Sequence, residues 1–174
     1  NFTNSLLVGA DGTGTLNSAD GNTGVGSGIL AALTTGDNNV AIGLTSLATN
    51  TTGGDNTAVG AEALRLNVGG TRNSAVGRNA LEANTSGGDN TGMGTNALLL
   101  NTTGSDNTAF GADSLDSNTT ADGNTAIGSS SLPANTTGAS NTAVGKESLL
   151  ANTTAGDNTA LGFRSMCKTT TGCQ

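Results

Sequence analysis

The sequence predicts an all-β protein, a parallel β-solenoid or β-roll built from ten seventeen-residue coils. Three observations predict it. The string Asn-Thr-Ala-Val-Gly at residues 56–60 returns in similar form at 73–77, at 90–94 and at the same spacing up to 158–162, with no insertion or deletion. Glycine-rich turn signals alternate with short runs of β-branched character in each copy. With only three Phe and no Trp or Tyr, the chain lacks the large side chains of an ordinary globular core. A fixed period of this kind is typical of repeats that stack on one another.

The first segment of each copy joins an asparagine, a large apolar residue and a glycine. We expect the asparagines to lie above one another and to form a hydrogen-bonded ladder. The apolar residue is expected to point into the interior, and the glycine to turn the chain with a positive φ. The predicted ladder is Asn22, Asn39, Asn56, Asn73, Asn90, Asn107, Asn124, Asn141 and Asn158. The predicted core residues are Val25, Ile42, Val59, Val76, Met93, Phe110, Ile127, Val144 and Leu161. The predicted turn glycines are Gly26, Gly43, Gly60, Gly77, Gly94, Gly111, Gly128, Gly145 and Gly162.

The second segment supplies another apolar column, four residues after the glycine and usually preceded by Ala or Ser. We expect this column to be buried as well, with the small residue lying where another backbone or another subunit comes close. Its members are Leu30, Leu47, Leu64, Leu81, Leu98, Leu115, Leu132 and Leu149. A third segment, Asn-Thr-Thr-Gly in its fullest form, is expected to turn the chain back towards the next copy.

The repeat predicts a single domain over residues 1–174, with a degraded first copy at 5–21 and regular copies over 22–174. The chain begins at Asn1 and shows no signal peptide, so we expect it to be a piece of a longer product. The net charge is −7, and the six basic residues are scattered, which argues against a nucleic acid partner. No apolar run approaches the roughly 18 residues of a membrane span.

The chain contains few of the residues that usually perform catalysis. There is no His and no Tyr, and the three Glu are scattered, so neither an enzyme nor a cofactor is predicted. Ca²⁺ is the one metal ion for which the sequence offers candidate ligands, because several aspartates share one register and Ca²⁺ binds carboxylate oxygens. Arg72 and Ser140 interrupt that column, and solvated turn residues are the competing interpretation. The column consists of Asp55, Asp89, Asp106 and Asp157.

The sequence raises two possible covalent modifications, and it does not decide either of them. Cys167 and Cys173 can form a small-loop disulfide, link neighbouring chains or remain free thiols in a terminal turn. Seven Asn-x-Ser/Thr sequons can carry glycans in a eukaryotic secretory setting, or serve as turn and ladder residues in a bacterial or phage setting. These sequons begin at Asn1, Asn50, Asn84, Asn101, Asn118, Asn135 and Asn152.

The repeat string Asn-Thr-Ala-Val-Gly-x-x-Ala-Leu-x-x-Asn-Thr-Thr-Gly resembles the head repeats of trimeric autotransporter adhesins. It is closer still to the long arrays of bacterial and phage tail-fibre-like proteins. The resemblance covers residues 5–174. It implies a left-handed parallel β-roll with three chains around one axis, exposed on a cell or virion surface and used for adhesion or receptor contact. A membrane-anchor barrel, a heptad stalk and a C-terminal chaperone domain are not among the residues of this chain.

We therefore expect a structural component of an extracellular fibre with an adhesive or receptor-contacting role. The few apolar residues per coil are too small a core to offset the entropy of ordering a whole coil, which favours packing against copies of the chain. The alternative is a subunit of an extracellular filament whose coils stack end to end between molecules.

Overall fold

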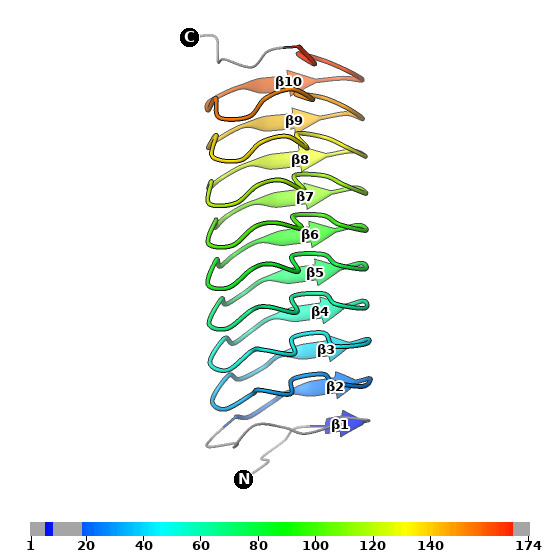
Figure 1. Cartoon of the computed structure of the whole chain (residues 1–174), viewed down its shortest axis with the longest axis vertical. Coiled ribbons are helices and arrows are strands. Elements are labelled where there is room, and N and C mark those ends of the chain that lie inside the picture. The colour runs from blue at the N-terminus through cyan, green and yellow to red at the C-terminus, as the bar shows by residue number, and fades with distance from the viewer. Residues whose placement is uncertain (1–5, 9–18, 169–174) are drawn as a thin grey trace.

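Ten short parallel strands form one sheet in which each strand pairs with the next strand along the chain. The computed structural model describes residues 6–8 and 19–168, and within these residues it contains no helix. Figure 1 shows the strands one above another along a single rod. The strands are β1 (Leu6–Val8), β2 (Thr23–Val25), β3 (Val40–Ile42), β4 (Thr57–Val59), β5 (Ser74–Val76), β6 (Thr91–Met93), β7 (Thr108–Phe110), β8 (Thr125–Ile127), β9 (Thr142–Val144) and β10 (Thr159–Leu161).

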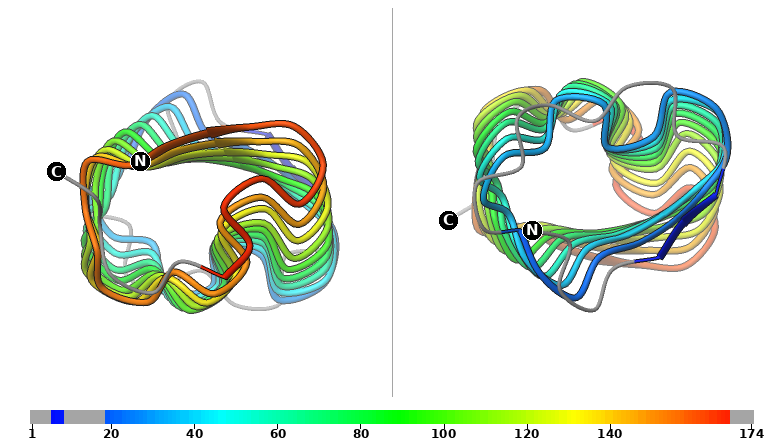
Figure 2. Two further views of the ribbon diagram at one scale, coloured as in Figure 1. Left: turned by 90° about the horizontal axis from the view of Figure 1, so that it is seen from above. Right: turned by 90° about the horizontal axis from the view of Figure 1, so that it is seen from below.

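The pairing register follows the sequence period. Thr57 of β4 lies opposite Ser74 of β5, one full repeat further along the chain, and every other pair keeps the same offset. Equivalent residues of successive copies therefore lie directly above one another. Seen along the axis, each coil covers the previous one with a gradual rotation (Figure 2). The predicted parallel β-solenoid is confirmed.

Hydrogen bonds between coils continue outside the strands. The Leu64 backbone N–H donates to the Ala80 carbonyl at 3.0 Å, and the Val68 N–H donates to the Thr85 carbonyl at 2.9 Å. On another side of the coil the Arg72 N–H donates to the Gly54 carbonyl at 3.1 Å. Adjacent coils are thus joined around their perimeter, which satisfies backbone groups that the short strands leave unpaired.

The core is a set of narrow columns of small residues and leucines. The eight predicted leucines are almost completely buried, and so is the residue before each of them, which is Ala or Ser in every copy after the one that contains Ile29 and Leu30. The middle residue of each strand, Ala in most coils, completes the apolar interior. From Leu47 to Leu149, each coil contributes one large side chain to this apolar set, its leucine.

The prediction that the third residue of each strand points inward is wrong. These side chains are half-buried or exposed, and several rank among the most exposed large apolar residues of the described chain. Successive side chains of a strand point to opposite faces, so an inward middle residue sends its neighbours outward. The corrected positions are Val25, Ile42, Val59, Val76, Met93, Phe110, Ile127, Val144 and Leu161.

The leucine column has a left-handed backbone. Its φ values run from 46° at Leu30 to 55° at Leu98, a region that bulky residues rarely occupy. Each such residue costs about 1–2 kcal/mol of backbone energy, and burial of the leucine side chain offsets a cost of that size. Val and Ile never occur at these positions in the described coils, which fits the stronger restriction on β-branched residues.

The nine predicted turn glycines adopt positive φ, from 116° at Gly162 to 141° at Gly26. They also allow close contact between coils. A Cβ on Gly77 would lie 2.5 Å from the Gly94 carbonyl oxygen, closer than real Cβ atoms approach. Glycine is therefore required at this corner both by its backbone conformation and by the tight stacking.

Candidate functional site: two asparagine ladders and the outer face of the sheet

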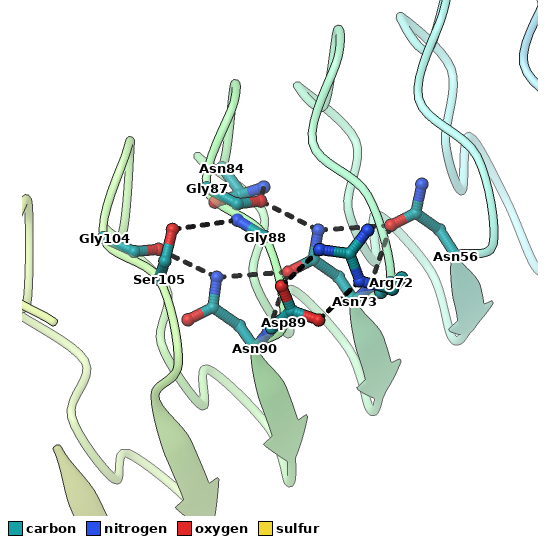
Figure 3. A network of polar contacts seen from close by, with 10 residues as sticks. All are labelled: Asn56, Arg72, Asn73, Asn84, Gly87, Gly88, Asp89, Asn90, Gly104 and Ser105. Carbon is teal, nitrogen blue, oxygen red and sulfur yellow. Dashed lines mark hydrogen bonds and ion pairs between the residues drawn. The ribbon is translucent and has the colours of Figure 1, made fainter. Parts of the chain in front are cut away.

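The predicted asparagine ladder runs through the interior of the rod. The side-chain amide of Asn73 donates to the Asn56 Oδ1 at 3.1 Å and to the Gly87 carbonyl at 2.9 Å. The backbone N–H of Asn73 also donates to the Asn56 Oδ1, at 3.0 Å. Asn90 repeats the arrangement one coil further on (Figure 3). Each side chain therefore links its own coil to the preceding one.

A second asparagine ladder lies beside the first, and it consists of the sequon asparagines from Asn50 onward together with Asn67. Of the two interpretations left open for the sequons, turn and ladder residues is the one that the structure supports. The Asn84 side-chain amide donates to the Asn67 Oδ1 at 2.8 Å and to the Gly87 carbonyl at 2.9 Å. Gly87 thus receives one hydrogen bond from each ladder, from Asn73 and from Asn84. The second ladder is formed by Asn50, Asn67, Asn84, Asn101, Asn118, Asn135 and Asn152.

The two ladders share the glycine-rich turn that closes each coil. A Cβ on Gly87 would lie 2.2 Å from one carbonyl of the next coil, at Gly104, and 2.6 Å from the Asn84 Oδ1. This crowding favours Gly between the ladders in most coils, although Ala121 and Ala155 occupy the equivalent position in two of them. Buried amides with complete hydrogen bonding add stiffness and fix the register between coils.

The second ladder contradicts the interpretation of these sequons as glycan acceptors along an outer edge. Asn84 and its equivalents are at most 1% exposed. Their Nδ2 atoms, where a glycan would attach, donate hydrogen bonds inside the rod, to the preceding coil and within their own coil. In the folded rod these side chains are almost inaccessible to solvent and leave no room for an attached sugar. The positions concerned are Asn50, Asn84, Asn101, Asn118, Asn135 and Asn152. Asn1 lies outside the described residues.

The outward side chains of β2–β10 form a surface that we call the sheet face. The first residue of each strand is Thr, except for Val40 in β3 and Ser74 in β5, and the third is always a large apolar residue. Exposure of the third residue reaches 55% at Phe110 and 78% at Leu161. No charged residue occurs in any Asn-to-Gly segment from 22–26 to 158–162. The sheet face is therefore a continuous uncharged surface with an apolar stripe.

Charged residues lie on other sides of the coil, and some pair between coils. Arg72 Nη2 lies 2.6 Å from Asp89 Oδ2, and Arg164 Nε lies 2.6 Å from Glu147 Oε2. Hydrogen bonding to Arg72 lowers the pKa of Asp89, and hydrogen bonding to Arg164 lowers the pKa of Glu147. Arg72, Asp89 and Arg164 are exposed and Glu147 is half-buried; each pair joins equivalent positions of neighbouring coils and adds a modest contact between them.

The pKa of Asp116 is shifted in the opposite direction from those of Asp89 and Glu147. Partial burial raises its pKa, and the nearby Asp113 carboxylate raises it further. Ser117 donates a hydrogen bond that acts in the other direction. Asp116 thus disfavours the folded state at neutral pH relative to an exposed aspartate.

The aspartate column occupies a turn with left-handed backbone. Asp55, Asp89, Asp106 and Asp157 have φ between 58° and 60°. Asp and Asn tolerate this conformation better than most residues, which accounts for their frequency here. Among residues 6–8 and 19–168, no group of three or more His, Cys, Asp or Glu side chains is arranged to hold a metal ion.

The two cysteines are only partly placed. Cys167 is half-buried in the last described coil, whereas Cys173 lies outside the described residues. Their disulfide stays a prediction. In the described part of the chain, no pocket is found, and no helix has the length and apolar character to cross a bilayer.

Comparison of the chain with protein-family models, with curated proteins and with solved structures gave no match.

Proposed function

We propose that this chain is a rigid segment of an extracellular fibre, displayed on a cell or virion surface and used for adhesion or receptor contact. The proposal includes the left-handed coil and the homotrimer that the repeat resemblance implies. The observation that supports it best is the pair of asparagine ladders inside a rod whose coils also share backbone hydrogen bonds.

The mechanical role follows from the way these bonds are arranged. Separating the coils that contain Asn73 and Asn90 breaks the ladder contacts of Asn90 and, with them, the strand pairing of β5 and β6. Bonds spread around the coil resist bending as well as extension. A repeated unit also lets the length of a fibre change in increments of one coil, about 4.8 Å each.

Single-molecule force spectroscopy on the full chain tests the mechanical role. Coils that yield one at a time should each release about 55 Å, because an extended segment replaces one coil of the stack. The expected record is a series of evenly spaced steps of that size. Extension without measurable resistance would contradict the mechanical role.

Adhesion needs its own experiment. Beads coated with the chain should bind some members of a panel of cell and extracellular-matrix surfaces better than albumin-coated beads do. Binding equal to albumin across the panel would remove adhesion from the proposal and leave the mechanical role.

A further inference from the structure

We infer that the sheet face is the surface through which copies of this chain pack side by side. The inference rests on the proposed self-association of the fibre and names the surface that performs it. The side chains involved are the third residues of the strands, such as Val76, Phe110 and Ile127, flanked by the threonines that begin the strands.

Charge distribution favours a second copy as the partner. The chain carries a net charge of −7, so two copies repel each other over most of their surface. The Asn-to-Gly segments that make the sheet contain no Asp, Glu, Lys or Arg, whereas other sides carry ion pairs such as Arg72–Asp89. The sheet face, with its exposed apolar stripe, is therefore a surface on which two acidic rods can meet without burying a charge.

The period of the surface favours the same partner. The sheet face repeats one Thr-x-Val-like unit per coil over the nine strands β2–β10. A partner that fills every unit must repeat with the same rise, about 4.8 Å. A second copy has the same rise because it is built from the same coils, so a contact formed at one coil is repeated at the next.

The size of the surface sets the strength of the contact. Eight intervals of about 4.8 Å and strands about 10 Å long give a face of roughly 400 Å² in projection. A monomer rarely leaves a larger apolar patch exposed, yet a standard interface buries about 800 Å² on each partner. The association should therefore depend on concentration and strengthen as coils are added.

The test uses sedimentation equilibrium of the full chain over a range of concentrations, with reductant present so that no intermolecular disulfide contributes. The double variant Val76→Asp, Phe110→Asp places two charges on the sheet face. The matched control Val68→Asp, Leu100→Asp places the same two charges at apolar residues of similar exposure outside it, 45% and 48%. Because all four residues are partly exposed, both variants should keep the wild-type thermal midpoint in dilute solution.

The wild type and the control should shift with concentration from 16.7 kDa to a small multiple of that mass, two or three times as large. The sheet-face variant should remain at 16.7 kDa, with a dissociation constant raised by about 100-fold or more, because facing like charges oppose association.

Three results would overturn the inference. These are a wild type that stays monomeric at all concentrations, a sheet-face variant that associates as the wild type does, and a mass that grows without limit in both double variants. The force record separates this failure from that of the proposed function, since a monomeric rod can still unfold in resistant, evenly spaced steps.

Discussion

Ala75 and Val76 are neighbours in β5, and they face opposite environments. Ala75 is completely buried, while Val76 is 39% exposed and belongs to the sheet face. In a globular protein the larger of two apolar residues is usually the one inside. Here the small residue is inside and the large one outside, and the other strands from β2 to β10 repeat the arrangement with Ala or Gly in the middle.

The difference shows that the width of the coil decides which side chains enter the interior. At Gly92, which occupies the equivalent middle position in β6, an added Cβ would lie 3.2 Å from the Ala97 carbonyl oxygen and 3.4 Å from Leu81 Cδ1. The interior at this level holds a methyl group and little more. The leucine of each coil and the asparagine ladders fill the remaining space, so larger strand residues are excluded.

The largest effect is expected where a charge enters the interior ladder. Asn73→Asp replaces an amide that donates to Asn56 and Gly87 with a buried carboxylate that donates nothing at neutral pH. We expect a loss of about 3–5 kcal/mol in the free energy of unfolding, measured by urea denaturation.

The control for this change is Asn38→Asp, an exposed asparagine with φ of 57°. It loses an exposed hydrogen bond to Asp55 Oδ1 and places a like charge beside that carboxylate in solvent, so it should lower the free energy of unfolding by only about 1 kcal/mol. Equal losses in the two variants would mean that the first ladder is not buried.

A large loss is also expected in the leucine column. Leu81→Ala removes a fully buried side chain and should cost about 2–5 kcal/mol. Leu100→Ala removes the same atoms from a side chain that is 48% exposed and should cost much less. Thermal melts of the two variants make the comparison, and similar midpoints would argue against one leucine per coil as the core.

Ser46 offers a gain of stability. Its Oγ is buried without a hydrogen-bond partner, whereas the equivalent Ser114 Oγ donates to the Gly111 carbonyl at 2.8 Å. The three consecutive coils that follow Ser46 have Ala at this position. We expect Ser46→Ala to stabilise the fold by about 1 kcal/mol and Ser114→Ala to give no such gain. A loss of stability in Ser46→Ala would show that the hydroxyl is satisfied.

The smallest effect is expected from the ion pairs between coils. The pKa values of Asp89 and Glu147 are lowered in the folded state, so their contribution is complete above the ordinary carboxyl pKa. It is lost as the pH falls through the lowered values.

The double variant Arg72→Gln, Arg164→Gln should therefore lose less stability on acidification than the wild type, and salt should reduce the difference. Urea midpoints at neutral and acidic pH give the measurement. An identical loss of stability on acidification in both proteins would show that these ion pairs do not stabilise the fold.

Much of this fold could be predicted from the period alone. Constant spacing places equivalent residues above one another, which correctly located the first asparagine ladder, the leucine column and the turn glycines. The orientation of the strands was missed, because Val59 and its equivalents were placed inside on size. Once the interior is known to be narrow, the alternation of Ala58 with Val59 predicts that the small residue points inward and the large one outward.

The second ladder remained one of two alternatives for a different reason. Asn84 and Asn101 stand in Asn-Thr-Ser or Asn-Thr-Thr strings, which also describe exposed turns and glycan sites. The available signal was that asparagine holds this register in most copies and that no charged residue replaces it. The left-handed backbone of the leucines could not be predicted, although the absence of Val and Ile from their column is consistent with it.

Thermal unfolding of Ala75→Asp beside Val76→Asp distinguishes the narrow interior from the outward sheet face, since the same charge is placed on adjacent residues of one strand. We predict that Ala75→Asp lowers the midpoint sharply, because it buries a carboxylate in a space that holds a methyl group. Val76→Asp should keep the wild-type midpoint in dilute solution. The reverse order, or equal losses, would contradict the division between a narrow interior and an outward sheet face.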